Sequence, residues 1–170
     1  MPPVAEQPFD PFPLLATLQR HEVDFIVIGL IAAIAQGYPM ATRDLDVTPS
    51  REPDNVERLA EALRQLQAKL RTPGEPVDFP IEADYLAGVP SWTLVTPLGE
   101  LDILFEPAGT RGYDDLKRDA VEVTLGVPVL VASLVDVIRM KQATGREKDQ
   151  MQLPALRRTL EVTRRSDLEQ

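Results

Sequence analysis

The sequence predicts an α/β (α+β) fold, in which a mixed β-sheet is flanked by helices and followed by a helical C-terminal extension. Runs with strand-like and helix-like patterns follow one another without the regular βαβ alternation of an all-parallel sheet. Two pairs of strand-like runs are separated by short glycine-containing turns, which indicates antiparallel hairpins. Beyond residue 133 the spacing of apolar residues is helical.

Composition is typical of a folded globular protein. The chain has 170 residues, of which 44% are hydrophobic and 26% charged, so it can bury a core. It contains no cysteine, which excludes disulfides and thiolate metal sites. Residues 1–13 lack a basic region followed by an apolar run, so we expect no signal peptide, and the apolar stretch 25–35 is too short to span a bilayer. We expect a soluble, cytoplasmic protein with no membrane partner.

Charge is distributed unevenly along the chain. The net charge is −9, but residues 1–138 hold 10 basic and 22 acidic side chains, whereas residues 139–165 hold 8 basic and 3 acidic ones. The C-terminal segment is therefore a basic island on an acidic body. A solvated helix surface accounts for such an island, and so does a binding surface for an anionic partner.

The N-terminal third shows a helix, a buried strand, a short helix and a second strand. Asp10 and Pro11 are expected to cap and start the first helix, with Phe12, Leu15 and Leu18 on its buried side. The further elements expected here are a strand at 24–28 ended by Gly29, an apolar helix at 30–36, and an alternating strand at 42–48.

The middle of the chain is expected to contain the longest helix and then several strands. Asp54 and Glu57 have capping-box spacing, and apolar residues continue at helical spacing to Leu70. The strands expected next are 77–85, 91–96 and 100–105, the last two joined by a turn at 97–99. The elements expected after Gly109 are a helix at 113–120, a hairpin of 121–125 with 127–131, a helix capped by Ser133 that runs to 144, and a final helix at 148–164.

Two carboxylates are expected to point together from the second strand. Asp44 and Asp46 are two residues apart, and alternate strand residues project from the same face. Asp102 is the single charge within the apolar run 101–105, so a neighbouring strand would bring a third acid. Converging carboxylates repel one another unless a cation compensates them, and an oxygen-only set favours Mg²⁺ or Mn²⁺ over zinc. Each acid taken alone is more often an exposed or hydrogen-bonded side chain; the combination favours a metal site.

These residues resemble the signature of the nucleotidyltransferase superfamily related to DNA polymerase β. An apolar strand is followed by Gly29-Leu30, then by thirteen residues (31–43), then by Asp44-Leu45-Asp46, with Asp102 later. Residues 25–47, together with the C-terminal segment SLVDVIRMKQATGREKD, are similar to the AbiEii/MenT-type toxins of bacterial toxin–antitoxin systems. Several of those toxins add nucleotides to the 3′ end of tRNA, so the resemblance implies an NTP substrate, an RNA acceptor and a cognate antitoxin.

The resemblance also implies roles for matching positions. Asp44 and Asp46 would bind the metals and Asp102 would help to deprotonate the acceptor hydroxyl, while Gly29 would let phosphate approach the start of the following helix. The residues expected to contact the nucleotide or to order its site are Gly29, Thr42, Arg43, Lys141, Arg146, Lys148 and Asp149. Ordinary surface cations are the competing interpretation of Lys141 and Arg146. The expected organisation is a catalytic core at 1–110 and a segment at 111–170 that completes the nucleotide site.

One residue departs from the superfamily pattern, which has a small residue after the glycine. Leu30 stands there and would either crowd the triphosphate or turn into the core. Two other functions therefore stay open beside RNA 3′-end transfer: nucleotidyl transfer to a protein hydroxyl, and a degenerate fold that only binds a partner. His21 is expected at the surface rather than as a catalytic base, and Trp92 in the core rather than as a base-stacking platform.

Overall fold

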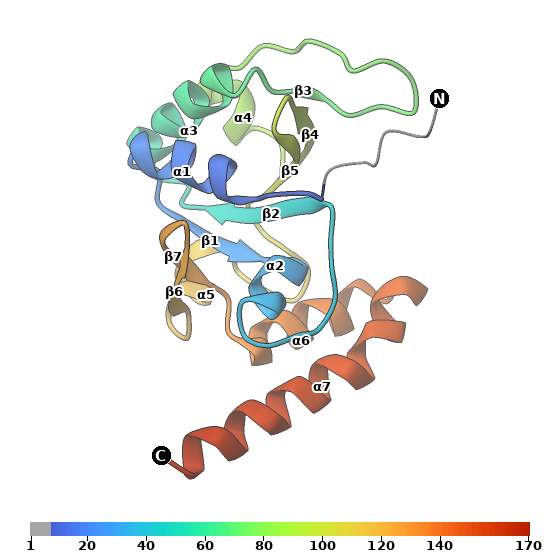
Figure 1. The fold of residues 1–170 in the computed structure, drawn as a ribbon. Coiled ribbons are helices and arrows are strands. Elements are labelled where there is room, and N and C mark those ends of the chain that lie inside the picture. Colours follow the sequence, from blue (N-terminus) through green and yellow to red (C-terminus); the bar gives the residue numbers. More distant parts are fainter. Residues whose placement is uncertain (1–7) are drawn as a thin grey trace, which may run out of the picture.

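The computed structural model describes residues 8–170 (Figure 1). Residues 1–7 lie outside the described residues, and with them lie most of the segment expected to lack a signal peptide and the start of the expected catalytic core. Among the described residues, no helix has both the length and the apolar character needed to cross a membrane.

A seven-stranded mixed sheet organises the molecule, as the sequence predicts. The strands are β1 (Phe25–Ile28), β2 (Asp44–Pro49), β3 (Lys69–Leu70), β4 (Ser91–Thr96), β5 (Gly99–Leu104), β6 (Val121–Leu125) and β7 (Val127–Val131). Their order is β3-β4-β5-β2-β1-β7-β6. The pairs β2–β5 and β1–β7 are parallel and the other pairs are antiparallel. Strand β5 therefore lies beside β2, which places Asp102 next to the Asp44–Asp46 pair.

Helices cover both faces of this sheet. They are α1 (Phe12–Arg20), α2 (Gly29–Ile34), α3 (Pro53–Gln65), α4 (Ala83–Ala87), α5 (Tyr113–Lys117), α6 (Leu134–Thr144) and α7 (Glu147–Leu168). Figure 1 shows α1 and α3 on one side of the sheet and α2, α6 and α7 on the other. Helices α6 and α7 pack against each other, and α6 also packs against α2.

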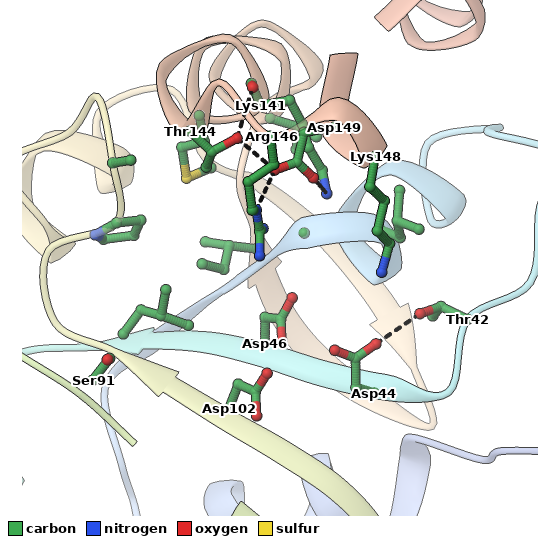
Figure 2. A pocket seen from close by; sticks show the side chains of 18 of the residues that line it. Thr42, Asp44, Asp46, Ser91, Asp102, Lys141, Thr144, Arg146, Lys148 and Asp149 are labelled. Carbon is green, nitrogen blue, oxygen red and sulfur yellow. Dashed lines mark hydrogen bonds and ion pairs between the residues drawn. The ribbon is translucent and has the colours of Figure 1, made fainter. Parts of the chain in front are cut away.

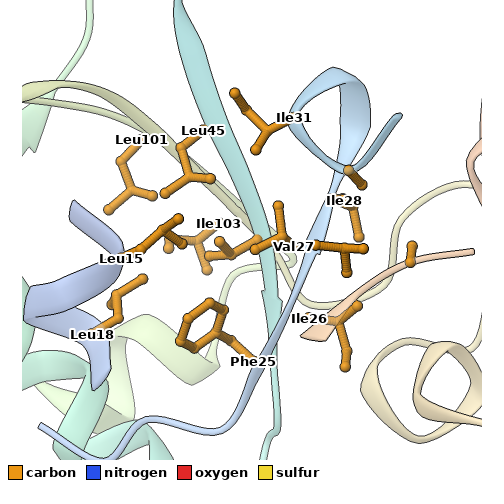
Figure 3. Close-up of a cluster of buried hydrophobic side chains, with 14 of the residues drawn as sticks. Leu15, Leu18, Phe25, Ile26, Val27, Ile28, Ile31, Leu45, Leu101 and Ile103 are labelled. Carbon is orange, nitrogen blue, oxygen red and sulfur yellow. The ribbon is translucent and has the colours of Figure 1, made fainter. Parts of the chain in front are cut away.

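The core lies between the sheet and these helices (Figure 3). All four residues of β1 are buried, since β1 is flanked by β2 and β7 and covered on both faces. Leu15 and Leu18 of α1 pack against one face, where Leu45 and Leu101 are also fully buried. Leu45 and Leu101, which neighbour the acids in sequence, therefore pack β2 and β5 against the core. The acids point to the opposite face of the sheet.

The first helix differs from its prediction at its start. Helix α1 begins at Phe12, and Asp10 accepts a hydrogen bond from the Phe12 N–H at 2.9 Å from outside the helix. The Phe12 side chain, expected to be buried, is 44% exposed, and Leu14 is buried instead. The buried face of the helix is therefore formed by Leu14, Leu15 and Leu18.

The expected helix from Asp54 to Leu70 is shorter, and its expected capping box is wrong. Helix α3 starts at Pro53 after Glu52, and no side chain caps it. Asp54 lies in its first turn, where a negative charge still favours the helix dipole. The helix ends at Gln65, and Gln67 adopts a positive φ of 54°, which lets the chain turn into β3. Leu70 continues the helical spacing in sequence but belongs to this edge strand.

The strand expected at 77–85 is also wrong. Only Val77 bridges to the sheet, opposite Leu70, and residues 83–87 form α4. Pro80 supplies no N–H for a strand ladder, which limits pairing in this segment.

The C-terminal elements follow the predicted order. The β6–β7 hairpin turns at Gly126, and the Ser133 Oγ accepts a hydrogen bond from the Asp136 N–H at 3.1 Å at the start of α6. Gly145, with φ +65°, ends α6. Helix α5 is shorter than the predicted 113–120, and α7 extends beyond the predicted 148–164.

Candidate active site

The three acids form one cluster on the sheet. Asp46 of β2 pairs in register with Asp102 of the parallel neighbour β5, and Asp44 lies two residues before Asp46 on the same face. One oxygen from each of the three carboxylates lies within 4.8 Å of the others. Figure 2 shows all three side chains pointing into the same pocket. Such a set of oxygens matches the ligands that Mg²⁺ and Mn²⁺ prefer.

Gly29 makes room for the central carboxylate. It follows β1, has φ +67°, and a Cβ atom built on it would lie 2.5 Å from the Asp46 Oδ2 atom. Any side chain at position 29 would therefore collide with Asp46. Glycine is required at this position of the sequence signature because the Asp46 carboxylate lies against the start of α2.

The charged form of Asp46 is unfavourable in this site unless a cation compensates it. Burial, with the nearby charges of Asp44 and Asp102, raises its pKa from 3.8 to about 8, although Lys141 partly opposes the shift. Its Oδ1 atom is buried and has no hydrogen-bond partner among the described residues. An unpaired buried carboxylate oxygen costs free energy, and a divalent cation ligated by it would remove this cost. The residues present thus fit a hard divalent ion.

The outer two acids have partners. The Thr42 hydroxyl donates a hydrogen bond to the Asp44 Oδ1 atom at 2.9 Å. The Arg71 Nη2 atom lies 3.1 Å from the Asp102 Oδ1 atom. Burial raises the pKa of Asp102, while the charge of Arg71 opposes this rise.

The opposite wall of the pocket comes from α6 and α7 (Figure 2). The buried Asp149 carboxylate accepts hydrogen bonds from the Lys141 Nζ at 3.0 Å, from the Arg146 Nε at 2.7 Å, and from the Thr144 hydroxyl. Burial alone would raise the pKa of Asp149, but these three donors outweigh it and lower the pKa to about 2. Asp149 is therefore a fixed anion that holds two cations at the edge of the pocket.

The pocket between the two walls has a volume of about 300 Å³. The predicted site residues that line it are Gly29, Thr42, Asp44, Asp46, Asp102, Lys141, Arg146, Lys148 and Asp149. Arg43 is not among the lining residues and borders a separate hollow near residues 96–100. Leu30 lines the pocket and also packs against the core. The structure thus brings together every predicted site residue except Arg43.

Trp92 and His21, which were not expected to be functional, lie in the core and outside the pocket respectively. Trp92 is 6% exposed, stacks on Phe79 with ring centroids 5.1 Å apart and donates a hydrogen bond to the Leu86 carbonyl, so it is a core residue that also borders the pocket. His21 is half-buried, hydrogen bonds Gln65 and does not line the pocket.

Sequence reasoning missed Arg71 and Thr144. The position of Arg71 beside the acids could not be predicted, because the preceding residue, Leu70, fitted the helical spacing of 54–70. No strand was expected there. Thr144 is the last residue of α6, and its nearness in sequence to the predicted site residues 146–149 was the available signal.

Comparisons with known proteins support the fold. No protein-family model matches the sequence, and no curated protein matches it. Solved structures do match. TM1012 from Thermotoga maritima, assigned as a nucleotidyltransferase, has a TM-score of 0.50 at 16% identity over 88% of this chain and 89% of that chain. The lincosamide antibiotic adenylyltransferase LnuA, bound to lincomycin, has a TM-score of 0.56 at 14% identity over 86% and 93%. The antibiotic-resistance factor ANT(2'')-Ia has a TM-score of 0.51 at 16% identity over 92% and 88%.

The chain therefore has a nucleotidyltransferase fold, and its acid cluster lies in the pocket between the sheet and the α6–α7 segment. At 14–16% identity the likeness concerns the fold and does not extend to an acceptor or a biological role.

Proposed function

We propose that the protein is a Mg²⁺-dependent nucleotidyltransferase that moves a nucleoside monophosphate from an NTP to the 3′ end of an RNA, with tRNA as the preferred acceptor. The observation that carries this proposal is the pairing of two walls across one pocket. Three carboxylates meet within 4.8 Å on one wall, and Lys141, Arg146 and Lys148 stand on the other. Metal-bound triphosphate requires both kinds of group.

The acids would hold the metal and accept the proton. Asp44, Asp46 and Asp102 would ligate Mg²⁺ or Mn²⁺, which when bound would supply positive charge to the phosphoryl group and to the attacking oxygen. The 3′ oxygen would bond to the α-phosphorus while the bond from this phosphorus to the bridging oxygen of the β-phosphate breaks, releasing pyrophosphate. Asp102 would take the proton of the 3′ hydroxyl.

The opposite wall would bind the triphosphate. Lys141 and Arg146 are both held by the buried Asp149, so their positive groups are already in place before the nucleotide arrives. Lys148 lines the pocket without that tether. Thr42 and the backbone beyond Gly29 are proposed as further nucleotide contacts. In this organisation residues 1–110 form the catalytic core and residues 111–170 complete the nucleotide site.

The choice of RNA as acceptor depends on the charge of α7. Its exposed arginines are Arg157, Arg158, Arg164 and Arg165, and none has an ion pair within the part of the chain that the structure describes. Unpaired arginines on an acidic protein favour a polyanion. From the resemblance of residues 25–47 and of the α6–α7 segment we extend the proposal to a cytoplasmic toxin that is neutralised by a cognate antitoxin.

A small-molecule hydroxyl is the second candidate acceptor. It is favoured by the fold shared with LnuA, whose structure contains lincomycin, and by a pocket of about 300 Å³ that would hold a compact ligand beside the nucleotide. A protein hydroxyl as acceptor, and a fold that binds a partner without transfer, are the remaining outcomes that the experiment separates.

Label transfer tests the proposal. The protein is incubated with Mg²⁺, total tRNA and each of the four NTPs, labelled either at the α- or at the γ-phosphate. We expect α-label on RNA with one or more NTPs and no γ-label, because the transferred group contains the α-phosphorus alone. Asp46→Asn should abolish transfer, whereas Asp54→Asn, an exposed aspartate of α3, should leave it unchanged.

Other outcomes identify the alternatives. Label on a lincosamide added to the reaction and none on RNA would assign a small-molecule acceptor. Label on a protein band would assign a protein acceptor. Absence of α-label on any acceptor, with no binding of Mg²⁺–NTP by calorimetry, would replace the enzyme with a binding module.

A further inference from the structure

Arg71 lies in line with two of the three acids across the sheet. It follows β3, and its backbone N–H donates to the Thr93 carbonyl at 3.0 Å. Thr93 of β4 pairs with Asp102 of β5, and Asp102 pairs with Asp46 of β2. Four adjacent strands or strand ends thus place Arg71, Thr93, Asp102 and Asp46 in one row that runs from the sheet edge into the pocket.

The Arg71 guanidinium is fixed at several points. Its Nη2 atom lies 3.1 Å from the Asp102 Oδ1 and 3.4 Å from the Asp102 Oδ2. Its Nη1 atom lies 3.2 Å from the Glu100 Oε2 and donates to the Leu94 carbonyl at 3.2 Å. The Arg71 side chain is 28% exposed and that of Asp102 is 20% exposed, so solvent screens this pair less than a surface pair.

A cation in this place has two effects on the acid cluster. It orients Asp102, since a guanidinium binds carboxylate oxygens in a fixed plane. It also adds positive charge beside the oxygens that a divalent ion would use, and like charges a few ångströms apart repel. The oxygens of Asp102 are therefore already paired with the Arg71 guanidinium. A divalent ion that binds the cluster would have to bind the same oxygens.

We propose that Arg71 is a positioning residue that competes with the divalent ion for Asp102 and so weakens ion binding by the acid cluster. The inference depends on the proposed function in one respect: it assumes that the cluster binds a divalent ion. It does not assume nucleotidyl transfer or any particular acceptor. A site that binds its ion weakly alone retains it when the triphosphate adds its own oxygens, because the nucleotide supplies both ligands and negative charge.

Binding of Mn²⁺ alone tests the inference without any turnover. The probe is Mn²⁺ added to the full-length protein in the absence of nucleotide, followed by the electron paramagnetic resonance signal of the free ion. We expect Arg71→Met to tighten Mn²⁺ binding about tenfold, since it removes a positive charge beside the ligands. Arg71→Lys keeps the charge and should stay within about threefold of the native affinity.

Three controls make the result specific. Asp46→Asn should abolish the tight binding in the Arg71→Met background, which assigns the bound ion to the acid cluster. Arg58→Met removes an arginine that donates to the Glu22 carbonyl and pairs with Asp24 outside the pocket, and it should leave the Mn²⁺ affinity unchanged. Thermal unfolding of each variant confirms that the protein is folded at the assay temperature.

Unchanged or weaker Mn²⁺ binding by a folded Arg71→Met variant would overturn the inference, as would equal tightening in Arg71→Lys. The label-transfer experiment decides the proposed function separately. A protein that transfers no label but binds Mn²⁺ more tightly without Arg71 would support the inference and refute the enzyme; a protein that transfers label while Arg71→Met binds Mn²⁺ normally would do the reverse.

Discussion

The Asp46 carboxylate sits directly against Gly29, at a distance that no side chain at position 29 could tolerate. A Cβ atom on Gly29 would lie 2.5 Å from the Asp46 Oδ2. The backbone of Gly29, directly after β1, thus contacts the carboxylate of Asp46 in β2. Because the Asp46 Oδ1 atom is buried and has no hydrogen-bond partner among the described residues, a change at Gly29 acts first on the acid cluster.

Gly29→Ala is expected to lower the transfer rate by about tenfold to a hundredfold, since displacement of a carboxylate by about 1 Å costs this much in an oriented site. Positive φ strain adds about 1 kcal/mol of lost stability. Gly145→Ala is the matched control, because Gly145 has a similar φ of +65° but nothing lies within 4 Å of its Cβ position. Rates and melting temperatures of both variants separate strain from collision. Equal losses of rate in the two variants would contradict the steric role of Gly29.

Stability in EDTA is expected to fall as the pH rises from about 4 to about 8. The native pKa of Asp46 is about 8 and its unfolded value is 3.8, so the native state binds the extra proton between these values. Deprotonation then costs the native state about 1–3 kcal/mol, after allowance for screening and relaxation. Thermal melts at pH 4.5 and pH 8.5 measure this loss, and Mg²⁺ should restore most of it at pH 8.5. Asp46→Asn should remove both the pH dependence and the effect of Mg²⁺.

Asp149→Asn is expected to raise the KM for NTP about tenfold, because an amide no longer holds Lys141 and Arg146 as ion pairs. The fold should lose about 2 kcal/mol as well, since two cations lose their buried partner. Glu147→Gln, an exposed acid at the start of the same helix, is the control. Steady-state kinetics measures the KM for NTP, and unfolding in urea measures the loss of stability. A pure loss of stability with an unchanged KM would remove Asp149 from the nucleotide site.

Leu30→Ser places a small residue after the glycine, as the superfamily pattern has. Leu30 borders the pocket, so we expect the KM for NTP to fall about threefold as space opens for the triphosphate. Some stability, about 1 kcal/mol, should be lost because Leu30 also packs against the core. Ile34→Ser, on the same helix and outside the pocket lining, controls for loss of packing. A higher KM in Leu30→Ser would show that leucine contributes to the nucleotide site.

Replacement of the four exposed arginines of α7 by glutamine is expected to weaken tRNA binding and to flatten its salt dependence. Each phosphate contact that is lost lowers the slope of log affinity against log salt by about 0.9 on duplex nucleic acid. The measurement is filter binding at several salt concentrations. The control replaces Arg20 and Arg64, which lie on α1 and α3, by glutamine. Transfer to a small-molecule acceptor should be unaffected by either set, and an unchanged tRNA slope would assign the arginines of α7 to another partner.

Much of the fold could be predicted because its signals are local. The β-branched run of β1, the glycine that ends it and the β6–β7 hairpin around Gly126 each carry their information within a few residues. The common direction of Asp44 and Asp46 follows from strand geometry alone. Their use as metal ligands stays a prediction, as do the roles of Lys141 and Arg146.

What could not be predicted depends on pairing between distant segments. Leu70 has helical spacing from Leu63 and Leu66, yet the edge of the sheet recruits it into β3, since Gln67 turns the chain. The contact between Arg71 and Asp102 exists only because of that edge strand. Sequence periodicity carries no information on which strand lies beside which, so Arg71 could not be placed at the site.

The two walls of the pocket come from segments that lie far apart in the sequence. The acids lie between residues 44 and 102, whereas Lys141, Arg146 and Asp149 belong to the α6–α7 segment, which is synthesised after them. The three carboxylates are therefore synthesised well before the cations that lie opposite them in the pocket. A product truncated before α6 would retain the acid cluster and would lack Lys141, Arg146 and Asp149 on the other side of the pocket.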